Sequence, residues 1–501
     1  MGASRGPSRA LFAAIPLLVV GAGVSACRDR PPAAARPVVI LQASDILSLD
    51  PNDEIDSVTA AVLNNVYEPL VGFDEDLKTR MILAESYEHP EPERWRFHLR
   101  GGIRFHDGTP LDAEVARDAL LRLRASPTQE ATAFLGHVAE VAAVDRLTLD
   151  VVTREPRALL ASLPFVFITR PPPSRGAPPV GTGPYVVKEW VRGRHVLLER
   201  VDGYWGGAAR IARARFEDEP DAERRAARVF EGSADIAHAI PPERASQVPG
   251  GSRIARRRGI TVRYIGFDLR PARDNPFTDL RVRKAFHLAL DRDALVRGVA
   301  GAATVATQPV APLIFGFDPG LSAPARDVTE ARRLLAEAGH GKGLRARLDL
   351  ADARLTVARL IQAQVKEAGL DLELAPLPGN GVYDRAEAGE SRLFFVGWDC
   401  TTGEATEFFE FCLHTPGGGY GQGNFGRYSN RELDAITEGS AAILDQRQRQ
   451  AALQRVNRMV MAELPVLPLY VEDDLYAVRA GVRFRPRADS ELRLLDIALE
   501  E

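Results

Sequence analysis

The sequence predicts an α/β protein with at least two lobes, and two observations support this prediction. First, strand and helix patterns alternate: Leu348 to Leu350 is a buried-strand run, Arg354 to Ala368 has helical spacing, and Leu370 to Leu374 is the next strand. This order is typical of parallel sheets. Second, a chain of 501 residues is longer than one hydrophobic core normally supports. Farther on, Ile436 to Met461 predicts one long helix rich in Gln and Arg.

The first 26 residues indicate export. Arg5 and Arg9 precede an apolar run over residues 10–24, which is too short for a comfortable membrane span. The run leads into Val-Ser-Ala before Cys27, and small residues before a cysteine resemble the bacterial lipobox. We expect cleavage before Cys27 and lipidation of its thiol and new amino group, so that the extracytoplasmic protein is anchored to the membrane, facing the periplasm in a Gram-negative cell. The alternative is an ordinary signal peptide cut nearby.

Residues 27–37 are rich in Pro, Ala and Arg and predict a tether, because such a segment cannot bury a core. The whole chain carries a formal net charge of −4, and loss of two arginines with residues 1–26 makes it −6 over the remaining 475 residues. This charge gives no sign of the basic face that nucleic acid binding demands. Cys400 and Cys412 remain beside Cys27, and they form either a disulfide or two separate buried thiols.

The segment from Arg94 to Leu123 predicts a strand, a turn and a helix. Apolar and polar residues alternate over 94–100, as in a half-buried strand. The string HDGTP over 106–110 predicts a turn. Apolar residues at spacings of three and four over 111–123 then share one helical face, with Asp112 as a candidate N-cap. The His-Asp pair of the turn could serve metal or acid–base chemistry, but a turn with a side-chain hydrogen bond is favoured by Asp-Gly.

The ordered strings of this segment resemble the hallmark of the family 5 extracytoplasmic solute-binding proteins, the dipeptide, oligopeptide and nickel receptors of ABC importers. The glycine-rich string GTGPY lacks the Lys-Ser/Thr of a P-loop and the third glycine of a dinucleotide fingerprint, and in the resembled family it is a structural turn. The similarity continues in order along nearly the whole mature chain, through strings at residues 49–51, 65–71, 181–185, 232–236, 275–286, 424–434 and 464–470.

The resemblance implies a two-lobed periplasmic-binding-protein fold of type II, with an extra small subdomain in the first lobe. The first lobe would span residues 38–262 with the subdomain at about 67–170, the second lobe 263–475, and residues 476–501 would return to the first lobe. The lobes would close around a solute by a hinge motion and deliver it to an ABC permease. We expect a monomer that binds a di- or oligopeptide, needs no cofactor and makes or breaks no bond.

The candidate ligand site follows the buried-strand run from Leu393 to Val396, where Gly-Trp-Asp places Trp398 and Asp399. In α/β sheets, ligands meet the loops beyond the carboxyl ends of strands. A tryptophan offers a flat apolar wall, although it can equally be a core residue, and a carboxylate can pair with an ammonium group. In peptide-binding members of the resembled family, an aspartate of this loop holds the peptide α-amino group.

This chain has Glu404-Ala405 where the resembled family usually has Asp-Pro, so Asp399 and Glu404 are both candidates for the anchor. Asp45 is a third candidate ligand-binding residue. It lies in the loop after the first strand, Val38 to Leu41, which leads to the interlobe cleft in that family.

Two rival functions remain. The first is the same receptor role for a metal chelate, an oligosaccharide or an opine-like amine. The nine histidines are scattered, and no pair has metal-ligand spacing, which disfavours a metal site built by the protein. The second is a secreted hydrolase. The sequence contains neither Gly-x-Ser-x-Gly nor His-Glu-x-x-His, so we expect no catalytic residue and no enzyme activity.

Overall fold

The computed structural model describes residues 36–53, 56–128, 134–171, 174, 176–246, 248–272 and 274–500. Residues Pro37–Glu501 form one compact unit, and the following description concerns this unit. The expected signal peptide and the lipidation site Cys27 lie outside the described residues. Within the described ranges, no helix combines the length and the apolar character needed to cross a membrane.

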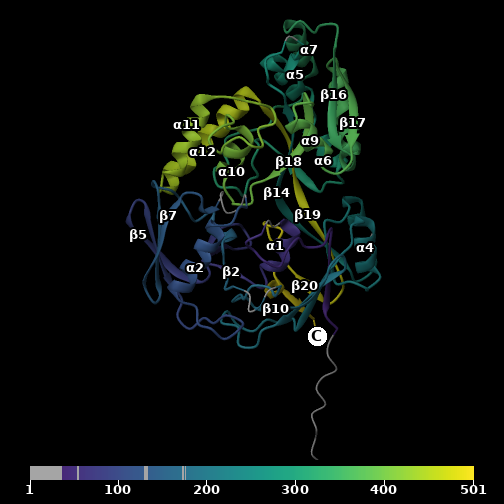
Figure 1. Ribbon diagram of the computed structural model, residues 1–501. Coiled ribbons are helices and arrows are strands. Elements are labelled where there is room, and N and C mark those ends of the chain that lie inside the picture. Colours follow the sequence, from purple (N-terminus) through teal and green to yellow (C-terminus); the bar gives the residue numbers. More distant parts are fainter. Residues whose placement is uncertain are drawn as a thin grey trace, which may run out of the picture. The chain divides into compact units, whose positions relative to one another are not determined.

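An eleven-stranded sheet runs through the unit (Figure 1). Its strands are, in spatial order, β10 (Tyr185–Val191), β11 (His195–Arg200), β12 (Arg213–Asp218), β1 (Val38–Gln42), β13 (Ile236–His238), β19 (Val466–Val478), β14 (Arg253–Phe267), β18 (Leu393–Asp399), β16 (Leu344–Ala351) and β17 (Leu370–Leu377), with β15 (Ala303–Val305) beside β19. The pairs β1–β12, β1–β13, β16–β17 and β16–β18 are parallel, and the other neighbouring strands, including β10–β11–β12 at one end, are antiparallel.

The long strands β14 and β19 join the two halves of the sheet. They pair from Arg253 opposite Val478 to Gly266 opposite Val466, with irregular register near Arg258 and Arg263. Figure 1 shows both strands running from the group of elements around β16 and β17 to the group around α1 and β20. The boundaries expected from the sequence, at 262/263 and 475/476, therefore fall inside these two strands.

The first part of the chain contains a second, smaller sheet and a helix. A four-stranded antiparallel sheet has the order β5 (Ala84–Glu91), β6 (Arg94–Leu99), β8 (Thr148–Thr153), β7 (Val138–Asp145). Burial alternates along β6, and α2 (Ala113–Arg124) begins at Asp112, whose carboxylate accepts a hydrogen bond from the Val115 amide at 2.9 Å. The strand, the turn and the N-cap predicted from the sequence are thus confirmed.

Shorter elements complete the first lobe. The helices are α1 (Ser57–Leu63) and α4 (Ala222–Phe230), capped by Asp56 and Asp221. Short strands pair as β2 (Glu68–Pro69) with β9 (Phe167–Ile168), β3 (Val71–Phe73) with β4 (Thr79–Met81), and β20 (Val482–Phe484) with β21 (Ile497–Leu499). The core around α1 buries residues from both ends of the chain, including Tyr67, Tyr185 and Tyr476.

The second lobe follows the strand–helix–strand order expected from the sequence. Its helix α8 (Leu355–Glu367) connects the parallel strands β16 and β17. The prediction of one long helix over Ile436 to Met461 is wrong, because two helices occupy this region. The Asp445 carboxylate accepts a hydrogen bond from the Gln448 amide and caps the second helix. The lobe's other helices are α5 (Leu280–Ala289), α6 (Arg292–Gly298), α7 (Val328–Glu337), α9 (Gly381–Glu387), α10 (Ala405–Phe408), α11 (Arg431–Ala441) and α12 (Gln446–Glu463).

Candidate functional site

Trp398 lies near the carboxyl end of β18 and is half-buried. Its ring stacks on Phe411, with 4.6 Å between ring centroids and 24° between the planes. The indole Nε1 is buried and has no hydrogen-bond partner within the described part of the chain. A buried donor without an acceptor is costly. Trp398 therefore makes the core contact that the sequence allowed, and its role as a wall for a ligand stays a prediction.

Asp399 is the last residue of β18 and stays exposed to solvent. It lies opposite Thr261 of β14. Desolvation by the surrounding protein raises the pKa of the Asp399 carboxyl above its usual value, while the Thr261 hydroxyl and the Arg263 guanidinium act in the opposite direction. The Asp399 carboxylate is thus exposed to solvent and also flanked by protein atoms. Such a carboxylate is suited to bind a cationic group from solution.

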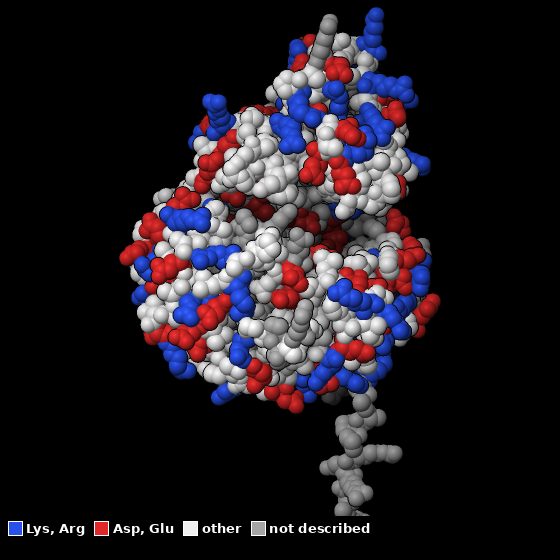
Figure 2. All heavy atoms as spheres, viewed as in Figure 1, with Lys and Arg blue, Asp and Glu red and all other residues white. Residues whose placement is uncertain are grey.

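Other carboxylates act on Asp399 from β19. Glu472 pairs with Arg263 at 2.6 Å and also with Arg354. Burial favours the neutral form of Glu472, but the two guanidinium groups outweigh it and hold its pKa below the usual value. Asp474 also acts on Asp399, and its charge, like that of Glu472, raises the Asp399 pKa. Figure 2 shows acidic side chains in the hollow that crosses this face of the unit.

Glu404 lies at the N-terminus of α10 and forms an ion pair with Arg449 of α12. The guanidinium carbon of Arg449 also lies 5.2 Å from the ring centroid of Phe315. Burial lowers the pKa of Arg449 to about 10. Of the two candidate anchors in the loop, Glu404 is thus already paired with a protein cation, whereas Asp399 is accessible.

Asp45 lies between β1 and α1, and both of its carboxylate oxygens are hydrogen-bonded. They accept from the indole Nε1 of Trp190 at 3.2 Å and from the amide of Gly193 at 2.7 Å. These bonds attach the β1–α1 loop to the turn between β10 and β11. Among the described residues, no hydrogen bond or ion pair joins Asp45 to Trp398, Asp399 or Glu404.

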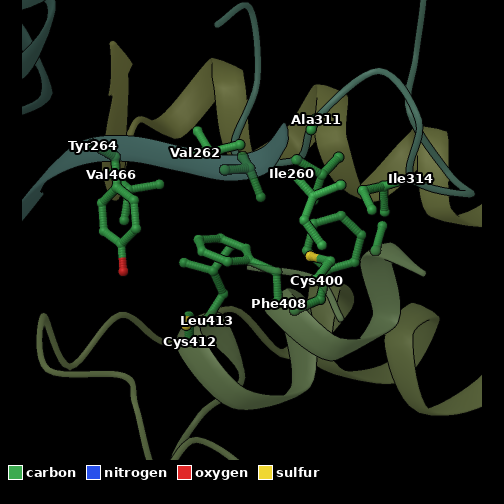
Figure 3. Close-up of a cluster of buried hydrophobic side chains, with 14 of the residues drawn as sticks. Ile260, Val262, Tyr264, Ala311, Ile314, Cys400, Phe408, Cys412, Leu413 and Val466 are labelled. Carbon is green, nitrogen blue, oxygen red and sulfur yellow. The ribbon is translucent and has the colours of Figure 1, made fainter. Parts of the chain in front are cut away.

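Cys400 and Cys412 are buried free thiols, which corresponds to the second of the two alternatives and not to a disulfide. Figure 3 shows both in one cluster of buried apolar side chains. The sulfur of Cys412 is hydrogen-bonded to the side chain of Tyr264, and burial raises the pKa of both thiols well above the usual value. Neither thiol therefore has the reactivity of an exposed thiolate.

Glu407 is a feature of the loop that the sequence analysis missed. Its carboxylate accepts hydrogen bonds from the Thr402 amide at 2.9 Å and from the Thr402 hydroxyl at 2.8 Å. Burial raises the pKa of Glu407 to about 7, in spite of these bonds. No spacing in the sequence marks this residue, because its pKa depends on the surrounding packing.

Replacing Glu407 with Gln is expected to flatten the pH dependence of stability. The folded state keeps the Glu407 proton up to about pH 7, whereas the unfolded chain releases it near the usual value of 4.5. The stability that this group contributes is therefore present at low pH and is lost as pH rises from about 4.5 to about 7. Urea unfolding of both proteins across this range is the measurement, and equal slopes would contradict the assignment.

Comparisons with known proteins identify the relatives of this chain. Residues 78–420 match the family model for bacterial extracellular solute-binding proteins, family 5, middle region. The glutathione-binding protein GsiB of Pectobacterium atrosepticum is 29% identical over 483 residues, covering 91% of this chain and 92% of that protein. GsiB of Salmonella paratyphi A is 27% identical over 470 residues, covering 88% of this chain and 90% of that protein.

Solved structures share the fold at lower identity. CtaP of Listeria monocytogenes has a TM-score of 0.82 at 20% identity, covering 93% of this chain and 99% of that one. NikA of Brucella suis in complex with Fe(III)-EDTA has a TM-score of 0.81 at 22% identity, and the match covers 93% of this chain and 100% of that one. DppA of Helicobacter pylori in complex with the peptide STSA has a TM-score of 0.77 at 21% identity, and the match covers 93% of this chain and 98% of that one.

These similarities confirm the two-lobed fold of periplasmic binding proteins that the sequence predicts. Proteins of this kind are extracytoplasmic receptors of ABC importers and not enzymes. In the part of the chain that the structure describes, no group of three or more His, Cys, Asp or Glu side chains is placed to hold a metal ion. The chain belongs to family 5 of the bacterial extracellular solute-binding proteins.

Proposed function

We propose that this receptor captures a short peptide between its first lobe, residues 38–262 with the return segment 476–501, and its second lobe, residues 263–475. It then delivers the peptide to the permease as a monomer anchored through a lipid at Cys27. The support for the anchor is the lipobox-like sequence before Cys27.

The accessible carboxylate of Asp399 beside the half-buried ring of Trp398 is the observation that carries the peptide assignment. The carboxylate pairs with the peptide ammonium group. The ring covers an apolar side chain of the peptide. The names of the relatives, which bind glutathione, and the peptide in the DppA structure point to the same class of solute.

The other two candidate residues have supporting roles in this proposal. Glu404, paired with Arg449, holds the start of α10 and thereby shapes the loop that carries Asp399. Asp45 accepts hydrogen bonds from Trp190 and Gly193 and fixes the loop after β1, which contributes to the first-lobe side of the site.

Replacing Asp399 with Asn is expected to weaken peptide binding by about tenfold or more, the effect of losing a hydrogen bond between charged groups. Calorimetric titration with glutathione and with the peptide STSA, each also in N-acetylated form, measures the change. Acetylation should cost the wild type as much affinity as the substitution does. It should cost the Asp399→Asn variant little, because the same interaction is already lost.

Asp371→Asn is the matched control, because Asp371 is an exposed carboxylate on β17. Affinity unchanged in Asp399→Asn, or reduced equally in Asp371→Asn, would contradict the role of Asp399. Native mass spectrometry of the protein purified without refolding tests the solute class directly. A retained mixture of peptides would support the proposal, whereas a single non-peptide mass such as a metal chelate would replace the peptide and keep the receptor role.

A further inference from the structure

A cavity of about 330 Å³ lies in the first lobe, apart from the residues of the ligand loop. It is lined by residues that follow α1, by the short strands β2 and β4, by the segment 204–206 and by residues 493–495 near the end of the chain. Its volume is at the lower end of the range for small-molecule sites. Its lining includes three arginines, a buried glutamate and three aromatic residues, Tyr67, Tyr204 and Trp205.

Glu68 of β2 is the buried glutamate. Its carboxylate accepts three hydrogen bonds, from the hydroxyl of Thr182 at 2.8 Å, the hydroxyl of Tyr204 at 2.5 Å and the indole Nε1 of Trp205 at 2.8 Å. Burial raises the pKa of Glu68. Tyr204 and Trp205 line the cavity together with Glu68.

The three arginines are Arg80 of β4, Arg100 after β6 and Arg493 near the C-terminus. Nε of Arg100 donates to the Ile82 carbonyl at 2.7 Å, and Nε of Arg493 donates to Glu491 at 2.7 Å. Within the described residues, the other side-chain nitrogens of Arg100 and Arg493, and all those of Arg80, have no hydrogen-bond acceptor from the protein.

The charges around the cavity favour an anion. Three guanidinium groups and one carboxylate, that of Glu68, line the cavity, and burial raises the pKa of Glu68. Asp489, Glu491 and Asp496 also act on Arg493, but they do not belong to the lining. Guanidinium groups with free terminal nitrogens bind carboxylates and phosphates through paired hydrogen bonds. The guanidinium carbon of Arg100 also lies 5.9 Å from the ring centroid of Trp205, which places a cation beside an aromatic surface.

We propose that this cavity is a second ligand site, which binds a small organic anion with one carboxylate or phosphate group and one flat aromatic group. The anionic group contacts Arg80, Arg100 and Arg493, and the aromatic group packs on the rings of Tyr204 and Trp205. The site is independent of the peptide proposal, because none of its residues belongs to the loop of Trp398.

Fluorine NMR of the full chain labelled with 5-fluorotryptophan tests this proposal with phenyl phosphate as the probe. The protein has four tryptophans, and single Trp→Phe variants assign their signals. Phenyl phosphate is expected to shift the Trp205 signal in a saturable way and to leave the Trp398 signal in place. Benzylamine, which carries the same ring with a positive charge, is expected to leave Trp205 unchanged.

Arg80→Gln is the test variant, because Arg80 is exposed and its side chain has no partner to lose among the described residues. It is expected to weaken phenyl phosphate binding by about tenfold or more, as expected for loss of a charged hydrogen bond. Arg345→Gln on β16, an arginine that is 77% exposed, is the control and should bind as the wild type does. A Trp205 signal that does not shift, a shift at Trp398 instead, or equal binding by Arg80→Gln would overturn the proposal.

Discussion

Replacing Gly181 with Ala is expected to lower the free energy of unfolding by about 3 kcal/mol or more, the upper range for overpacking a buried site. An alanine Cβ at this position would lie 2.1 Å from the carbonyl oxygen of Val66 and 2.7 Å from Cδ1 of Tyr67. The obstacle is mainly backbone and cannot rotate away. It is also held in place, because the amide of Gly183 donates to the same Val66 oxygen at 3.0 Å.

Gly439→Ala is the matched control for this experiment. Gly439 lies in α11, and an alanine Cβ there would meet no atom within 4 Å. Since alanine is the better helix former, this variant is expected to gain about 0.5–1 kcal/mol. Urea unfolding curves of the three proteins give the comparison. A Gly181→Ala protein as stable as the wild type would show that the 181–185 turn can move away from Val66.

The sequence predicted local elements well, because their patterns lie within a few residues. The alternation in β6, the Asp112 cap and the order β16–α8–β17 are all confirmed. The pairing of β14 with β19 could not be predicted in this way, since it joins residues that are 200 or more positions apart. The break between α11 and α12 was missed because helical spacing continues across the Asp445 cap.

The short sequence strings that resemble family 5 show the same limit of prediction from local sequence. The 106–110 turn, the 181–185 turn and the segment after α1 were each recognised separately. The structure brings them into contact: the His106 amide donates to the Gly181 carbonyl at 2.9 Å, and Gly183 contacts both His106 and Val66. The side chain of His106 therefore belongs to a packing contact between turns, which agrees with the favoured prediction of a hydrogen-bonded turn.

For the candidate site, the sequence indicated candidate residues in one loop but not the state of each carboxylate. Asp399 and Glu404 were equivalent candidates by position. Their difference comes from Arg449, which is 45 positions from Glu404 in the sequence and reaches it through the packing of α12. In the same way, the pKa of Glu407 depends on burial, which no short motif encodes.

Replacing Arg449 with Ala is expected to lower the free energy of unfolding by about 3 kcal/mol, the lower end of the range for breaking a buried ion pair. The side chains of Arg449 and Glu404 are only 9% and 19% exposed. The substitution leaves the Glu404 carboxylate without its cation and removes the guanidinium beside Phe315. Thermal and urea unfolding at pH 7 measure the loss.

A double-mutant cycle separates the structural role of Glu404 from a direct role in ligand binding. Glu404→Gln combined with Arg449→Met removes both charges, so its cost in stability should be smaller than the sum of the two single costs. If the pair only supports the loop, the double variant keeps peptide affinity within a few-fold of the wild type, whereas Asp399→Asn does not. A double variant that folds stably and yet loses affinity as Asp399→Asn does would instead make Glu404 the anchor, because restored packing cannot replace a lost charge.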